Sequence, residues 1–275
     1  MRNRDILAAM PSTSFADTAA DAETDAELAA RLAAEAGALL VALRDELFDA
    51  GAPYWHVMDA GDELGHRYIN GELRRCRPGD AILDEEGRED PRRFGADRVW
   101  IIDPLDGTRE FGEPGRPDWA VHVALWGGDR FLAGAVALPA IGTVLATHPP
   151  AVVPDAGRAR PRIITSRSRA PYAAVLVANA LECDAVRLGS AGAKAMAVVL
   201  GEADLSVHDG GLYQWDSAAP VAVATAAGLH TSRIDGSPLV YNDPDPWLPD
   251  LLICRPELAE PALQALWGDG HLADR

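Results

Sequence analysis

The chain has 275 residues, 48% of them apolar, which suits one large or two fused α/β units with a substantial core. Its 25 Lys and Arg residues against 42 Asp and Glu residues give a net charge of −17, which disfavours a partner that is a nucleic-acid polymer, because such binding needs a basic surface. No apolar run reaches the roughly 18 residues of a membrane span, and three scattered cysteines without CxxC spacing predict a reduced, cytoplasmic protein without disulfides or structural zinc.

The first half of the chain predicts helices followed by strands. Residues 1–22 lack sustained periodicity and predict a disordered leader. Apolar residues at helical spacing predict a helix over 25–50 and a second over 63–75, the latter after a turn at Ala60-Gly61. Short β-like runs follow at 81–83, 99–102, 121–126, 131–138 and 143–148, and a proline-rich connector at 149–162.

The second half predicts alternating elements. Strands are expected at 163–164, 186–188, 205–208 and 251–254, and helices at 171–181, 191–201, 216–227 and 257–267. Strands dominate the first half, and strands alternate with helices in the second. This order predicts an α/β (α+β) protein with an N-terminal α+β half at 23–150 and a C-terminal α/β half at 151–275.

The segment VWIIDPLDGTREF at 99–111 carries the strongest chemical signal. A buried strand that ends in two acids, Asp103 and Asp106, is costly unless a cation neutralises them. Gly107 allows the backbone to approach a ligand closely, and Thr108 is a candidate N-cap whose following N–H groups would meet an anion. Oxygen donors without Cys or His suggest Mg²⁺ beside a phosphate, with a solvated turn as the alternative.

Two further acidic positions strengthen this interpretation. The run AILDEEG at 81–87 ends in Asp84, Glu85 and Glu86, and Asp216 stands at the start of an apolar helix. Taken singly, these are typical of a solvated turn and of a helix N-cap. Together with segment 99–111, they fit a site where two cations align an attacking water with the leaving oxygen. The three-residue spacing of the acids disfavours the DxDGT pattern of enzymes that form an aspartyl phosphate.

These segments, with GSAGAK at 189–194, WDSAA at 215–219 and DGSPLVYN at 235–242, resemble the inositol monophosphatase superfamily of Mg²⁺-dependent, lithium-sensitive phosphatases. DPLDGT followed by a basic residue and Glu-Phe is similar to the 3′(2′),5′-bisphosphate nucleotidases of the CysQ type. The resemblance covers roughly residues 24–270 and implies a layered αβαβα sandwich.

The activity that the resemblance implies is hydrolysis of the 3′-phosphate of adenosine 3′,5′-bisphosphate to AMP and phosphate, in sulfate assimilation. An inositol monophosphatase, a fructose-1,6-bisphosphatase-like sugar-phosphate phosphatase, activity on both classes of substrate, and a non-catalytic phosphometabolite sensor remain alternatives. The partner expected in each case is a small phosphorylated molecule, and superfamily members are often homodimers.

The resemblance also implies a set of metal ligands. Glu85, Asp103 and the Leu105 carbonyl would hold one Mg²⁺, and Asp103, Asp106 and Asp216 would hold a second. A third, looser ion would share Glu85, and Li⁺ is expected to inhibit.

Catalytic and substrate-binding roles follow from the same resemblance. Asp62 and Thr108 would orient and deprotonate the water, with a helix N-cap as the alternative role for Asp62. The amides of Gly107 and Thr108 would bind the scissile phosphate. Contacts to the rest of the substrate would come from the segments 165–169 and 189–194, through Ser166, Arg167, Ser190 and Lys194. Lys194 is the only lysine in the chain, whose other 24 basic residues are arginines.

The sequence departs from the family pattern at three places. Asp84 replaces the usual Ser or Gly and adds a charge beside Glu85. The segment 54–61 lacks the family's Val-Thr-x-x-Asp run and its upstream lysine, and His122 stands where Asn is commoner. His122 is interpreted as a satisfied strand residue.

Overall fold

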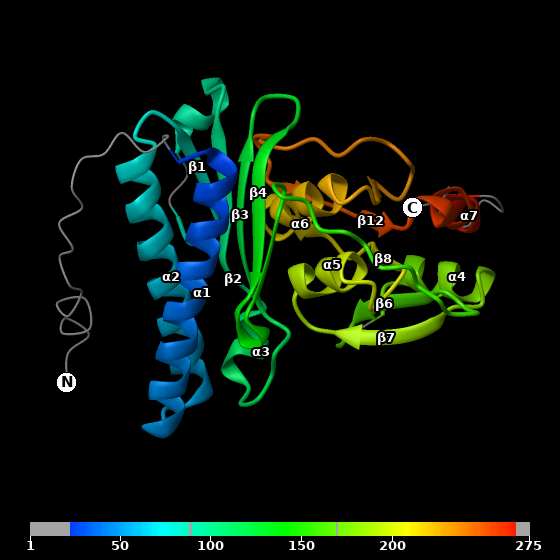
Figure 1. Ribbon diagram of the computed structural model, residues 1–275, viewed down its shortest axis with the longest axis horizontal. Helices are drawn as coiled ribbons and strands as arrows, with labels where there is room; N and C mark the ends of the chain where they lie inside the picture. The colour runs from blue at the N-terminus through cyan, green and yellow to red at the C-terminus, as the bar shows by residue number, and fades with distance from the viewer. Residues whose placement is uncertain (1–22, 88–89, 169, 268–275) are drawn as a thin grey trace.

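Five layers make up the molecule, which is described here by a computed structural model covering residues 23–87, 90–168 and 170–267. The layers alternate as helix, sheet, helix, sheet and helix (Figure 1). The αβαβα sandwich expected from the sequence is therefore confirmed. The predicted leader at 1–22 and the end of the second half at 268–275 lie outside the described residues.

Helices occupy three of the layers. The pair that covers the outer face of the first sheet is α1 (Asp25–Asp49) and α2 (Tyr54–Cys76). The pair between the sheets is α5 (Ala191–Val199) and α6 (Gln214–Ala226). The pair that covers the second sheet is α4 (Tyr172–Ala180) and α7 (Pro256–Trp267). Among the helices of the described ranges, none is long and apolar enough to cross a membrane.

The first sheet has the order β1-β2-β3-β4-β5, with β1 and β2 parallel and the other neighbours antiparallel. Its strands are β1 (Ala81–Asp84), β2 (Val99–Asp106), β3 (Ala120–Trp126), β4 (Phe131–Leu138) and β5 (Thr143–Ala146). The β2–β3 register shifts between Asp103 and Asp106, so the ladder is interrupted where the acids stand. A short helix, α3 (Thr108–Gly112), follows β2, and the 3₁₀ turns are η2 (Pro91–Gly95) and η3 (Pro139–Ile141).

The second sheet has the order β10-β12-β8-β6-β7. β6 runs parallel to β7 and β8, whereas β12 and β10 add in antiparallel fashion. Its strands are β6 (Arg162–Ser166), β7 (Asp184–Leu188), β8 (Leu205–His208), β10 (His230–Ser232) and β12 (Leu251–Cys254). A two-stranded pair of β9 (Leu212–Tyr213) and β11 (Trp247–Leu248) leads into α6. The short elements α3, β9, β10 and β11 were not predicted.

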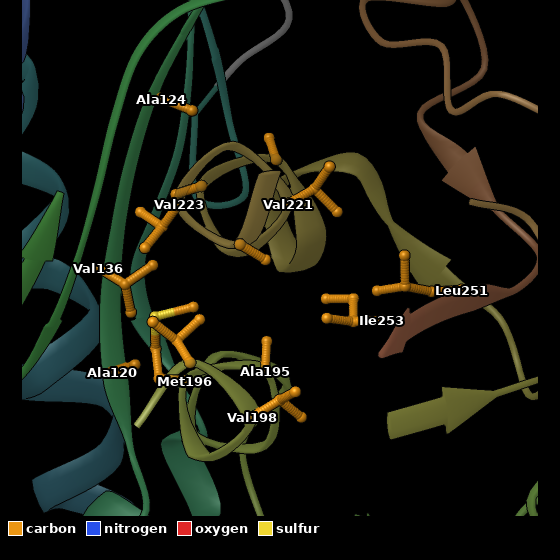
Figure 2. Close-up of a cluster of buried hydrophobic side chains, with 14 of the residues drawn as sticks. Ala120, Ala124, Val136, Ala195, Met196, Val198, Val221, Val223, Leu251 and Ile253 are labelled. Atoms are coloured by element: carbon orange, nitrogen blue, oxygen red, sulfur yellow. The ribbon is translucent and has the colours of Figure 1, made fainter. Parts of the chain in front are cut away.

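An apolar cluster between the sheets fixes α5 and α6 in the middle layer. Figure 2 shows Val136 of β4 facing Met196 of α5 and Val223 of α6, with Ile253 of β12 on the far side of the helix pair. Most of the other buried side chains on α5 and α6 are alanine or valine, which lets both helices fit between two sheets. The helix starts are thereby held beside the end of β2.

Helix α2 begins at Tyr54, nine residues before the predicted start at Glu63, so the expected turn at Ala60-Gly61 was wrong. Gly61 is helical and permits a close approach instead. A Cβ atom there would lie 2.6 Å from Phe111 Cε1 and 2.8 Å from Leu105 Cδ2. The alternative of an N-cap for Asp62 is also wrong, since this residue lies well inside the helix.

We predict that Gly61→Ala destabilises the protein by ~1–3 kcal/mol, because its methyl group would overlap the buried Phe111 and Leu105. Gly71→Ala is the matched control in the same helix. Its methyl group would meet no atom within 4 Å, so the better helix propensity of alanine should raise stability by ~0.5–1 kcal/mol. Urea unfolding followed by circular dichroism measures both, and equal stabilisation by the two variants would contradict the close packing.

Candidate active site

Four carboxylates converge at the edge where β1 and β2 end. The carboxylate oxygens of Asp103, Asp106 and Asp216 lie within 4.8 Å of one another. Glu85, directly after β1, lies close enough to Asp103 to share a hydrogen bond with it. Parallel pairing of β1 with β2 places Glu85 and Asp103 together, and α6 brings Asp216 from more than a hundred residues away. The structure thus brings all four predicted acids together.

Burial and mutual repulsion disfavour the charged forms of three of these acids. Burial of the Glu85 carboxylate, followed by repulsion from Asp216, raises the pKa of Glu85 to about 7. Glu85 as a whole residue is exposed, so this burial concerns its carboxylate. Burial and repulsion also raise the pKa of Asp216 to about 6, with Asp106 as the main repelling charge. The pKa of Asp103 is also raised well above its usual range, and its buried Oδ2 has no hydrogen-bond donor among the residues that the structure describes.

Asp106 is the exception, because donors surround it. Burial alone would raise its pKa, but His122 and Ser190 outweigh burial and lower the pKa of Asp106 to about 2. The Ser190 hydroxyl donates to Asp106, as do the amides of Ala191 at 3.1 Å and Gly192 at 2.6 Å. Asp106 is therefore a permanent anion. An unpartnered oxygen beside a fixed carboxylate, in an all-oxygen donor set, fits a hard divalent cation such as Mg²⁺.

His122 is a buried strand residue, as predicted, and its ring nitrogens lie near two of the acids, Nε2 near Asp106 and Nδ1 at 3.9 Å from Asp103 Oδ2. Its Nε2 lies 3.3 Å from Asp106 Oδ2, and its Nδ1 lies 3.1 Å from the Trp215 carbonyl, next to Asp216. Burial lowers the pKa of His122, but the neighbouring Asp106 outweighs it and leaves that pKa raised. A Cβ on Gly192 would overlap the His122 ring.

The Gly107–Thr108 turn lies beside the acids. Gly107 caps α3 with a φ of +85°, which favours glycine, so Gly107 is the N-cap and Thr108 is the first helical residue, contrary to the prediction. The Thr108 hydroxyl is 3.1 Å from the Leu105 carbonyl and 3.3 Å from Asp62 Oδ1. Burial, followed by the charge of Glu86, raises the pKa of Asp62 to about 7.

Asp84 does not add its charge to this cluster, contrary to the expectation from sequence. Its carboxylate points to α2, where His66 Nδ1 lies 2.5 Å away and the Asn70 amide donates to it. The Glu86 amide also donates to Asp84 at 3.1 Å. Asp84 therefore fastens the end of β1 to α2, and Glu85 next to it is left to face the other acids.

A pocket of about 430 Å³ adjoins the acids. The predicted substrate contacts Ser166, Arg167, Ser190 and Lys194 all line it, together with Arg109 and Glu110, which the site prediction missed. The Arg-Glu-Phe sequence after DPLDGT was the signal for those two.

The hydrogen bonds of the pocket residues show how each is held. Lys194 donates to the carbonyls of Gly189 and of Ser190, the latter at 2.7 Å, and its burial lowers its pKa. Ser190 caps α5 by accepting from the Ala193 amide at 2.9 Å. Arg167 forms ion pairs with Glu110 and Glu113.

Comparisons with known proteins agree with this geometry. A model of the inositol monophosphatase family matches residues 21–149 and 158–269. The 3′-phosphoadenosine 5′-phosphate phosphatase of Mycobacterium bovis is 49% identical over 244 residues, which cover 84% of this chain and 89% of the relative. The 3′(2′),5′-bisphosphate nucleotidase CysQ of Escherichia coli is 30% identical over 204 residues, covering 69% and 81%. A solved CysQ structure from Bacteroides thetaiotaomicron has the same fold, with a TM-score of 0.72, 24% identity, and coverage of 85% and 97%.

We predict that Asp103→Asn raises the melting temperature of the metal-free protein, because it removes a buried, repelled charge and gives the unpartnered position a donor. The same variant should lose the stabilisation that added Mg²⁺ gives the unsubstituted protein. Asp129→Asn, in the exposed turn between β3 and β4, controls for the change in net charge. A metal-free Asp103→Asn protein that melts below the unsubstituted one would contradict the repulsion.

We also predict an inverted pH dependence for the metal-free protein. Glu85, Asp216 and Asp62 have folded pKa values of about 7, 6 and 7, above the ordinary carboxyl values near 4. The folded state therefore binds protons more tightly than the unfolded state, and stability falls as the pH rises from about 5 through 7. Saturating Mg²⁺ should remove this fall, because a cation favours the charged forms. Urea midpoints measured with EDTA and with Mg²⁺ test the prediction, and a flat EDTA profile would contradict it.

Proposed function

The chain belongs to the inositol monophosphatase family, and we propose that it is an Mg²⁺-dependent phosphatase that hydrolyses the 3′-phosphate of adenosine 3′,5′-bisphosphate, giving AMP and phosphate. The observation that carries this proposal is the position of the acid cluster beside a pocket lined by three cationic side chains. Those side chains are Arg109, Arg167 and Lys194. The similarity to a mycobacterial 3′-phosphoadenosine 5′-phosphate phosphatase supports the choice of substrate.

In this proposal Glu85, Asp103, Asp106, Asp216 and the Leu105 carbonyl hold two Mg²⁺ ions, and a third shares Glu85. Bound there, Mg²⁺ acts as a Lewis acid that lowers the pKa of water and offsets phosphate charge. The residues before 150 supply most of these ligands and the Gly107 and Thr108 amides, and those from 151 onward add Asp216 and the other substrate contacts. The fixed charge of Asp106 anchors the cluster.

Proton transfer is assigned to Asp62 and Thr108. Asp62 has a pKa of about 7, which suits a general base that works near neutral pH. The Thr108 hydroxyl, within hydrogen-bond distance of Asp62, orients the water and passes on its proton. The amides of Gly107 and Thr108 are assigned to the scissile phosphate, since both residues line the pocket beside the acids.

The cationic side of the pocket receives the 5′-phosphate. Arg167 and Lys194 provide positive side chains on this side of the pocket, in a chain with a net charge of −17. Ser166 lines the same wall and adds a hydroxyl donor. A substrate with a single phosphate would use the acid cluster alone, which is why this pocket favours the bisphosphate over inositol phosphates.

Several properties accompany the proposal. The family resemblance implies inhibition by Li⁺, a role in sulfate assimilation and a homodimeric state. The cysteine pattern implies a cytoplasmic location. Lithium titration of the activity measures the inhibition, and light scattering of the purified protein measures the oligomeric state.

Phosphate release from adenosine 3′,5′-bisphosphate, inositol 1-phosphate and fructose 1,6-bisphosphate, each with Mg²⁺ and with EDTA, tests the function. We expect kcat/KM for the nucleotide to exceed that for inositol 1-phosphate by at least about tenfold, because tenfold corresponds to a single ~1.4 kcal/mol contact to the second phosphate. Asp216→Asn should abolish turnover, whereas Asp129→Asn should retain it. Preference for a sugar phosphate would overturn the nucleotidase assignment, and Mg²⁺-independent turnover would overturn the metal-dependent reaction.

A further inference from the structure

An ion-pair network crosses the wall of the substrate pocket. Arg167, just after β6, reaches to the α3 segment of the other half of the chain. Its Nη2 donates to Glu110 Oε1 at 2.7 Å and to Glu113 Oε1 at 2.9 Å, and its Nη1 donates to Glu113 Oε2 at 2.8 Å. Two carboxylates therefore hold a guanidinium that faces the pocket.

The two glutamates differ in how firmly they are held. Glu110 is buried, with 7% of its surface exposed, and a Cβ on Gly189 would overlap its carboxyl group. Its backbone carbonyl accepts from the buried Arg44 at 3.1 Å. Glu113 follows α3, and 47% of its side chain is exposed. Displacing Glu113 into water costs little, whereas Glu110 has no room to move.

The guanidinium keeps no parallel pair of free N–H donors for a phosphate while both glutamates are bound. Arginine has five N–H groups, and it binds phosphate best with two parallel ones. Three of the five on Arg167 are given to Glu110 and Glu113. The edge formed by Nη1 and Nη2, which suits bidentate binding, is occupied by Glu113. A phosphate can accept hydrogen bonds from both Nη1 and Nη2 only after the Glu113 carboxylate has moved away from them.

We propose that Glu110 is a positioning residue that keeps Arg167 at the pocket, and that Glu113 is a placeholder which the second phosphate of the substrate displaces from Arg167. The inference rests on the proposed function, since it assigns the Arg167 edge to the 5′-phosphate. Glu110 thereby supports selectivity for a doubly phosphorylated substrate, because it keeps at the pocket the guanidinium that the second phosphate binds. Glu113 opposes that selectivity, because its carboxylate competes with the second phosphate for the same guanidinium.

The two glutamates should respond to substitution in opposite directions. The readout is the ratio of kcat/KM for adenosine 3′,5′-bisphosphate to that for adenosine 3′-monophosphate, which lacks the second phosphate. Glu113→Gln removes the competitor and should raise the ratio roughly two- to fivefold, the scale of an exposed ion pair. Glu110→Gln frees Arg167 to leave the pocket and should lower the ratio about tenfold, through KM, as expected for loss of a hydrogen bond to a charged group.

Controls separate this role from general effects of charge or folding. Glu257→Gln removes the same charge at the exposed start of α7 and should not change the ratio. In an Arg167→Ala background, both glutamine substitutions should lose their effect on the ratio, since they act through Arg167. Melting temperatures identify variants that fold poorly, and the ratio cancels a loss of active protein.

The outcomes distinguish the inference from the function on which it rests. A lower ratio in Glu113→Gln, or an effect of either glutamine that persists without Arg167, overturns the inference alone. Turnover of inositol 1-phosphate without turnover of the bisphosphate overturns the proposed function and the inference together.

Discussion

Repulsion among buried carboxylates is the constraint on which this structure depends. Asp103, Asp106 and Asp216 lie within 4.8 Å of one another, with Glu85 beside them, where folding alone would keep like charges apart. The apolar cluster between the two sheets must hold α6, and with it Asp216, against this repulsion. Small residues on α5 and α6 make that cluster dense enough to do so. A bound cation converts the same arrangement from a cost into a source of stability.

The cluster combines one permanent charge with several adaptable ones. Asp106 is kept ionised by the start of α5 and by His122, so at least one anion always marks the site. Glu85 and Asp216 instead have pKa values near neutrality, and their charge depends on what is bound. The absence of a side chain at Gly192 makes room for this histidine, since a Cβ atom there would overlap the His122 ring beside Asp106.

Short-range patterns predicted much of this arrangement, because strands that end in acids mark the edge of a sheet. The family resemblance of the motifs at 81–87 and 99–111 implied that Glu85 and Asp103 share a metal, and the observed pairing of β1 with β2 places these two residues together. The start of α2 was mispredicted because Gly61 was taken for a turn residue, whereas its contact with Phe111 spans fifty residues. The ion pair between Glu110 and Arg167 was missed for the same reason, since its partners lie 57 residues apart. Such long-range contacts are set by packing, and the periodicity of apolar residues along one sequence does not predict them.

The solitary lysine shows why arginine does not serve everywhere in this site. Lys194 donates to the carbonyls of two successive residues, Gly189 and Ser190, in the tight turn before α5. A compact ammonium fits between two adjacent carbonyls, whereas a planar guanidinium needs a wider, fork-shaped acceptor such as a carboxylate. Arg167 has that acceptor in Glu113. The ammonium group of Lys194 therefore lies at the turn that carries Ser190, and the planar guanidinium of Arg167 lies at the wall where a second phosphate would bind.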